Sequence, residues 1–175
     1  MIDEQTRPEV AGVRVAASSR IMPALFFAVA GLVVIADQLS KRAISSAFLP
    51  DESRIVIPHL LYLTYVHNYR GAFGLFGVHP LALAVAAAII VVIFYAGYRQ
   101  GGATTSTHIA FGLILGGAIG NIIDRLRFHY VIDFIDLRWW PVFNLADSCI
   151  TVGVVLLLVR MLWHDRRSTL PASQG

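Results

Sequence analysis

The chain has 175 residues, of which 57% are hydrophobic and only 14% are charged, and its formal net charge is +3. Soluble domains carry about 25% charged residues, so this composition argues against a water-soluble core and predicts an integral membrane protein. The basic residues are scattered between apolar runs, which disfavours a nucleic-acid partner. Cys149 is the only cysteine, so neither an intrachain disulfide nor a multi-cysteine metal site can form.

Four apolar stretches are long enough to cross a bilayer, which takes about 20 residues per helix. They cover about residues 21–41, 80–98, 107–123 and 145–163. Residues 1–20 are polar and are expected to form a flexible tail, and residues 164–175 form a second polar tail. The sequence therefore predicts one all-α membrane domain over residues 21–163, with four transmembrane helices and both termini on the same side.

We expect secondary structure in the first connection, which joins the spans at 21–41 and 80–98. Residues 55–66 are dense in β-branched and aromatic side chains, which is typical of short strands. We expect a small β-sheet at the membrane surface, together with a short helical loop on the same side. The connection before the last span contains Trp139 and Trp140, an aromatic pair suited to the membrane–water interface.

The third stretch carries glycines at a spacing of four residues, Gly112, Gly116 and Gly120. This spacing places the three glycines on nearly one face of a helix. A neighbouring helix can approach such a face closely, because no side chain keeps the two backbones apart. We therefore expect another span to pack tightly against it.

Several polar side chains lie beside or within the apolar stretches, where a charged group costs about 2.5–3.5 kcal/mol to insert. Asp37 and Lys41 are one helical turn apart, and an ion pair that positions the helix end is the favoured interpretation for them. Asn121, Asp124 and Arg125 share one face at the end of the third stretch. For these three, a helix cap and a polar floor that contacts a ligand remain equally open.

Two further carboxylates, Asp133 and Asp147, indicate a reaction when they are considered together. Asp133 lies just before the fourth stretch, and Asp147 lies at its start, one helical turn after Asn144. The two carboxylates can therefore meet at the end of the bundle. A close carboxylate pair shares a proton, and it can take a proton from water while donating one to a carbonyl oxygen. Singly, each Asp is better explained as a helix cap or as a salt-bridge partner of Arg125 or Arg127.

The polar blocks taken together resemble those of the lipoprotein signal peptidases, the bacterial type II signal peptidases. The matching blocks, in chain order, are Asp37-Gln38-Leu39-Ser40-Lys41, Asn68 to Phe73, Gly116 to Arg125, Val131 to Asp136, and Phe143-Asn144-Leu145-Ala146-Asp147. They cover the chain from about Gly31 to Leu157, and five blocks in the right order make the resemblance specific. One block departs from the family pattern, because Arg70 stands where the family usually has Gly.

The resemblance implies a membrane aspartic endopeptidase that cuts diacylglyceryl-modified prolipoproteins before the lipidated cysteine. It implies that Asp133 and Asp147 are the catalytic pair, with substrate-binding or supporting roles for Asn121, Arg125, Asn144, Asn68, Asp37, Lys41 and Asp124. No metal or organic cofactor is expected, because the pair activates water itself. The expected partners are lipid-modified prolipoproteins and membrane lipids, and we expect a monomer.

Charge counts leave the orientation open, because seven basic residues fall on each side of the predicted bundle. The resemblance implies a multi-pass protein of the bacterial cytoplasmic membrane. Its termini and the loop of residues 99–106 would then be cytoplasmic. Both longer connections and the catalytic pair would lie near the extracytoplasmic face.

Two other classes of protein remain as alternatives. A small ion- or proton-coupled transporter also places Asp, Asn and Arg within the membrane. It predicts mid-membrane carboxylates with inverted repeats or broken helices, and the sequence shows neither. A non-catalytic membrane assembly factor would explain the glycine face but would leave Asp133 and Asp147 without a role.

Overall fold

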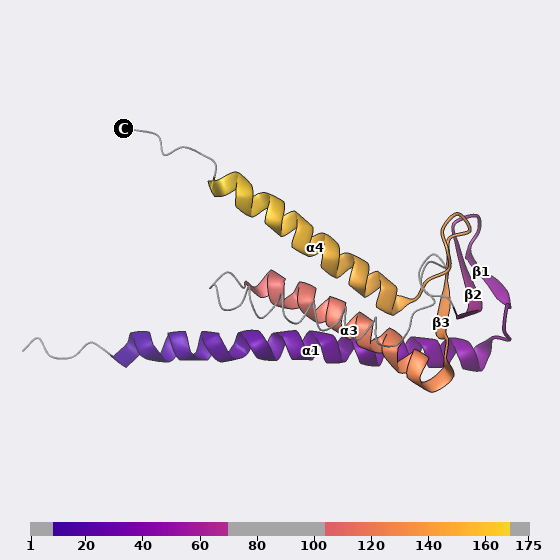
Figure 1. The fold of residues 1–175 in the computed structure, drawn as a ribbon, viewed down its shortest axis with the longest axis horizontal. Helices are drawn as coiled ribbons and strands as arrows, with labels where there is room; N and C mark the ends of the chain where they lie inside the picture. The colour runs from indigo at the N-terminus through magenta and orange to yellow at the C-terminus, as the bar shows by residue number, and fades with distance from the viewer. Residues whose placement is uncertain (1–8, 70–103, 169–175) are drawn as a thin grey trace, which may run out of the picture.

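The computed structural model describes residues 9–69 and 104–168 (Figure 1). It contains three helices, α1 Glu9–Ala47, α3 Thr105–Phe128 and α4 Leu145–Ser168. It also contains three strands, β1 Ser53–Ile57, β2 Leu61–Asn68 and β3 Val131–Asp136. The strands gather at one end of the helices, where α1 and α3 end and α4 begins (Figure 1). The predicted span at 80–98 and the departure at Arg70 lie outside the described residues.

Two of the helices are long and apolar enough to cross a membrane by length and composition. These segments are Ala24–Ala47 of α1 and Thr105–Phe128 of α3, and both extend past the predicted ends of their spans. Each therefore carries its polar block, which includes Lys41 in one and Asp124 in the other, within its last turns. α4 is also 24 residues long, and its assignment as a span stays a prediction.

The N-terminal segment differs from the predicted flexible tail. Helix α1 begins at Glu9, so residues 9–20 are helical in the structure. Alanines and arginines in this segment are good helix formers, and it contains no proline. A helix that is already nucleated in the apolar stretch propagates easily into such a sequence, because each added residue gains a backbone hydrogen bond.

Helix α3 packs against both α1 and α4 (Figure 1). A methyl group at Gly116 would lie 2.6 Å from the carbonyl oxygen of Ala30 in α1. On the other side of α3, a methyl group at Gly117 would lie 2.5 Å from the carbonyl oxygen of Ala146 in α4. The predicted close approach at the glycine face is confirmed, and Gly117 gives α3 a second close-packed face that the sequence analysis did not consider.

The strands form one antiparallel sheet in the order β1-β2-β3. The predicted small sheet is therefore present, and β3 joins it from the connection before α4. Residues of β3 are mostly buried on both faces. A hydrophobic cluster of Ile44, Tyr65, Ile132 and Phe134 packs this sheet against the end of α1. The cluster therefore holds β3 beside the end of α1.

The predicted short helical loop has no counterpart in the described residues of the two connections, 48–69 and 129–144. Residues 131–136 form a strand because their β-branched and aromatic side chains suit a sheet and because β2 offers a partner edge. The segment after β3 is irregular. It exposes Trp139 and Trp140 to 74% and 46%, respectively.

Candidate active site

The start of α4 is organised by a reciprocal cap between Asn144 and Asp147. The backbone N–H of Asp147 donates to Asn144 Oδ1 at 2.9 Å, and the backbone N–H of Asn144 donates to Asp147 Oδ2 at 3.3 Å. Such an exchange satisfies backbone donors that a helix start otherwise leaves unpaired. It also holds the Asp147 carboxylate at the positive end of the helix dipole.

Asp133 lies in the middle of β3 and is 2% exposed. Asn68 Nδ2 donates to its Oδ2 at 2.7 Å, and Asn144 Nδ2 donates to its Oδ1 at 2.7 Å. The same Asn144 that caps α4 around Asp147 therefore also binds Asp133. One asparagine contacts both predicted catalytic carboxylates and sets their relative position.

Asn121 supplies the second amide of the site. Its Nδ2 donates to Asp147 Oδ1 at 2.7 Å. Its Oδ1 accepts hydrogen bonds from Lys41 Nζ and Asn144 Nδ2, both at 3.0 Å. Because Lys41 can only donate, it fixes which end of the Asn121 amide faces it, and the NH₂ group is left to face Asp147.

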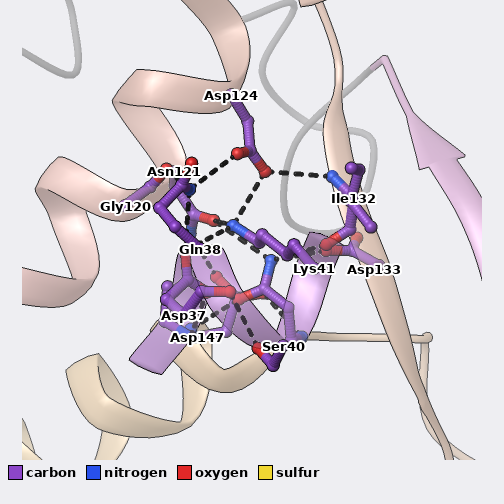
Figure 2. A network of polar contacts seen from close by, with 12 residues as sticks. Asp37, Gln38, Ser40, Lys41, Gly120, Asn121, Asp124, Ile132, Asp133 and Asp147 are labelled. Atoms are coloured by element: carbon purple, nitrogen blue, oxygen red, sulfur yellow. Dashed lines mark hydrogen bonds and ion pairs between the residues drawn. The ribbon is translucent and has the colours of Figure 1, made fainter. Parts of the chain in front are cut away.

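Lys41 lies at the centre of a buried charge network and is 2% exposed (Figure 2). Its Nζ is 2.9 Å from Asp37 Oδ2 and 2.8 Å from Asp124 Oδ2. Together with Asn121, these partners use all three donors of the ammonium group. The predicted Asp37–Lys41 pair is confirmed, and Asp124 is a second carboxylate partner. A buried lysine is tolerated here because its charge is paired and its protons are bonded.

The two carboxylates that bind Lys41 also hold the backbone beside each predicted catalytic residue. Asp37 Oδ1 accepts from the backbone N–H of Ala146, the residue before Asp147, at 3.1 Å. Asp124 Oδ2 accepts from the backbone N–H of Ile132, the residue before Asp133, at 3.2 Å (Figure 2). The Lys41 network therefore anchors both segments that carry the carboxylate pair.

Gln38 is a member of this network to which the sequence analysis gave no role. Its Nε2 donates to Asp124 Oδ1 at 2.9 Å and to the carbonyl oxygen of Gly120 at 3.2 Å. The spacing in the sequence indicates its position, since Gln38 and Lys41 are three residues apart and share a helix face. The spacing could place Gln38 on that face, but it could not identify partners on α3.

The electrostatic environment of Asp133 favours its protonated form. Burial raises the pKa of Asp133 to about 7, and the charge of Asp147 also raises it. The hydrogen bonds from Asn68 and Asn144 and the charge of Lys41 act in the opposite direction. Near neutral pH the carboxylate pair can therefore hold one proton, which is the state required for combined acid and base chemistry.

Arg125 lies close to the pair without forming an ion pair with it. Its Nη1 donates to the carbonyl oxygen of Asn121 at 3.4 Å, and the guanidinium interacts electrostatically with Asp147 and Asp133. Within the described part of the chain, no ion pair joins Asp133 or Asp147 to an arginine. The simple salt-bridge interpretation of these two carboxylates therefore finds no support there.

An open cavity of about 310 Å³ adjoins Asp133. It lies beside β2 and β3 and is lined by Val66, His67, Asn68, Tyr69, Asp133 and Val142. Of the two predicted catalytic carboxylates, only Asp133 lines this cavity. Among the residues that the structure describes, no group of three or more His, Cys, Asp or Glu side chains is placed to hold a metal ion.

Comparisons with known proteins point to one family. A family model described as signal peptidase (SPase) II matches residues 29–163. The lipoprotein signal peptidase of Syntrophomonas wolfei subsp. wolfei is 46% identical over 136 residues, which cover 78% of this chain and 91% of that protein. The lipoprotein signal peptidase of Moorella thermoacetica is 46% identical over 142 residues, which cover 81% of this chain and 93% of that protein.

A solved structure also matches the fold. A bacterial membrane enzyme determined by the in meso method at 2.3 Å resolution superposes with a TM-score of 0.74 at 30% identity. The match covers 86% of this chain and 94% of that enzyme.

Proposed function

The chain belongs to the signal peptidase II family, and on that premise we propose that Asp133 and Asp147 are its catalytic pair. The protein is a lipoprotein signal peptidase, an aspartic peptidase that removes signal peptides from prolipoproteins. The observation that carries our assignment is Asn144, whose side-chain amide donates to the Asp133 carboxylate while its backbone N–H donates to the Asp147 carboxylate. We assign supporting or substrate-binding roles to Asn68, Asn121, Arg125, Asp37, Lys41 and Asp124.

The two carboxylates have different environments, which suggests different roles. Asp147 lies in the first turn of α4, where the helix dipole favours a negative charge, so we assign it as the ionised partner that removes a proton from water. Asp133, whose pKa is raised to about 7, holds the shared proton and donates it to the carbonyl oxygen of the scissile peptide.

Attack of the resulting hydroxide gives a tetrahedral intermediate. Its collapse breaks the C–N bond, Asp147 passes its proton to the leaving nitrogen, and a hydroxyl proton of the intermediate returns to Asp133. The pair therefore regains its starting state without any other reactant. The guanidinium of Arg125 lies close enough to interact with both charges and can help to hold the peptide.

We further propose that the substrate is a diacylglyceryl-modified prolipoprotein cut before the lipidated cysteine. The carboxylate pair lies at the end of two apolar helices, and its Asp133 lines an open cavity. A lipid attached to the substrate can thus stay beside the helices while its peptide enters the cavity beside Asp133. By family membership we place the site near the extracytoplasmic face of the cytoplasmic membrane. All residues of the proposed site lie on one chain, so we propose that the protein acts as a monomer.

The directions of the helices support four spans. Both α1 and α3 end beside the sheet (Figure 1). A span at residues 80–98, which we propose, would return the chain across the membrane between them. Helix α4 begins beside the sheet and runs away from it (Figure 1), which supports a span at 145–163. By family membership we place both termini in the cytoplasm.

Cleavage of a purified, diacylglyceryl-modified prolipoprotein tests the proposal by a gel-shift assay. We expect Asp133→Asn and Asp147→Asn each to abolish cleavage while the protein remains folded. Asp51→Asn is the matched control, since Asp51 lies in an exposed turn before β1 and should be dispensable. Turnover by either active-site variant would contradict the assignment of the pair. Failure of the folded wild-type enzyme would leave the transporter alternative to be tested.

A further inference from the structure

A second groove of about 310 Å³ lies between α1 and α3, at the end that carries the sheet. Its lining residues are Gln38, Leu39, Lys41, Arg42, Ser45, Ile123, Asp124, Arg127, Phe128 and Ile132. They come from α1, α3 and the start of β3, and they do not include Asp133 or Asp147. The groove and the cavity beside Asp133 therefore share no lining residue.

Two arginines of the groove lack an ion-pair partner among the described residues. Arg42 and Arg127 are both exposed, and neither forms an ion pair within the part of the chain that the structure covers. Asp124, which also lines the groove, is already paired with Lys41. The guanidinium of Arg127 lies 5.8 Å from the ring centroid of Phe128, beside an apolar surface.

An exposed apolar stripe leads along α1 to the same place. Leu32, Ile35 and Leu39 are 67%, 58% and 60% exposed, respectively. Their spacing places them on one face of the helix, and Arg42 continues that face by one turn. Both arginines lie in the last turns of the two candidate spans, which end at Ala47 and Phe128. Arginines at such positions lie at the level of lipid headgroups.

We propose that this groove binds one anionic phospholipid, with its phosphodiester between Arg42 and Arg127. An acyl chain then lies along Leu32, Ile35 and Leu39. Guanidinium groups suit this ligand because they form paired hydrogen bonds with phosphate oxygens. The lipid would brace α1 against α3 at the level of the buried Lys41 network, without entering the cavity beside Asp133.

Lipid binding to the full-length protein tests this proposal. The protein is placed in nanodiscs of phosphatidylcholine, with or without added phosphatidylglycerol, and retained lipid is counted by native mass spectrometry. The melting temperature is measured in parallel. We expect wild type to retain one phosphatidylglycerol and to melt at a higher temperature when that lipid is present. In Arg42→Gln/Arg127→Gln, affinity should fall roughly 25-fold, since each basic residue near an anionic lipid contributes about fivefold.

Matched variants separate this groove from general charge effects. Arg54→Gln removes the same charge from β1, where Arg54 is paired with Glu52, and should leave the affinity for phosphatidylglycerol unchanged. Arg42→Lys/Arg127→Lys keeps the charge and should retain most of the binding. If the double Gln variant does not fold, the two single Gln variants carry the test, and each should lose about fivefold.

Four results would overturn the proposal. One is equal retention of phosphatidylcholine, and another is unchanged binding of phosphatidylglycerol by the folded Gln variants. The third is a rise in melting temperature with inorganic phosphate alone, which would indicate a free-anion site. The fourth is competition between phosphatidylglycerol and the lipidated substrate for cleavage, because the groove would then belong to the substrate site.

Discussion

Asn144 combines two tasks that usually fall to separate residues. Its side-chain oxygen caps α4 through the backbone of Asp147, while its side-chain nitrogen binds Asp133. The helix start and the carboxylate pair are therefore fixed by the same side chain, which is fully buried. A residue that only capped the helix, such as serine, would hold Asp147 but would leave one oxygen of Asp133 without this donor.

The pKa of Asp133 predicts how cleavage depends on pH. A raised carboxyl pKa means that the folded protein keeps the proton until the pH reaches about 7. Above that pH the pair loses its shared proton, so we expect kcat/KM to fall as the pH rises through about 7. The free energy of unfolding should change in the same direction. Binding of this proton stabilises the folded state at low pH, and that contribution is lost as the pH rises through 7.

The Asn68→Ala variant sharpens this pH prediction. The hydrogen bond from Asn68 favours the ionised form of Asp133 and lowers its pKa. Its removal should therefore move the descending limb of the pH–rate profile to higher pH, as measured from initial cleavage rates across the neutral range. A shift of that limb to lower pH would contradict the assignment of the limb to Asp133.

At the scale of elements, α3 is the helix that holds the others in place. Gly112, Gly116 and Gly120 face α1, while Gly117 faces α4. The close approach on both sides brings the last two turns of α3, with Asn121 and Asp124, within hydrogen-bond distance of residues on its neighbours. Small residues in the middle of α3 therefore determine the geometry of polar residues at its end.

Gly116→Ala tests the role of this close packing. The new methyl group would lie 2.6 Å from the Ala30 carbonyl oxygen, so α1 and α3 must move apart. We expect a loss of about 1–3 kcal/mol in unfolding free energy, measured in mixed micelles. Gly31→Ala is the matched control, because its methyl group meets nothing within 4 Å and should stabilise α1 slightly. Equal effects of the two substitutions would show that the contact does not matter.

At the scale of the whole molecule, the site is assembled from α1, β2, β3, α3 and α4. The hydrogen bond from Ala146 to Asp37 joins residues 109 positions apart in the chain. Lys41 lies at the point where these elements meet, since its carboxylate partners hold the backbone beside both Asp133 and Asp147. The network thus couples the packing of the molecule to the placement of the carboxylate pair.

Lys41→Met should therefore be costly for the whole fold. It would leave Asp37 and Asp124 buried without their cation, and breaking a buried pair costs about 3–5 kcal/mol. We expect a loss of this size in unfolding free energy. Combining it with Asp124→Asn should recover part of the loss, because one unpaired charge is then removed. A stability of Lys41→Met within experimental error of wild type would contradict the central role of the network.

Local patterns in the sequence were enough to predict a membrane protein, its small sheet, the glycine face of α3 and the Asp37–Lys41 pair. Each of these depends on residues close together in the chain, through apolar length, β-branched composition or helical spacing. The polar blocks also predicted which residues gather at the site, although their roles remain proposals. Residues 9–20 are helical because propagation from a nucleated helix overrides a polar composition.

Only the tertiary structure decided which polar groups bond to one another. The sequence left Asp124 with either a capping role or a ligand role, and its position beside Lys41 on another helix gives it a structural one. The same holds for Gln38, whose partners on α3 lie more than 80 residues away. A hydrogen bond depends on distances of a few ångströms between elements, and those distances are set by the packing of α3 and by the register of β2 on β3. Helical or strand spacing within a single segment carries no information about them.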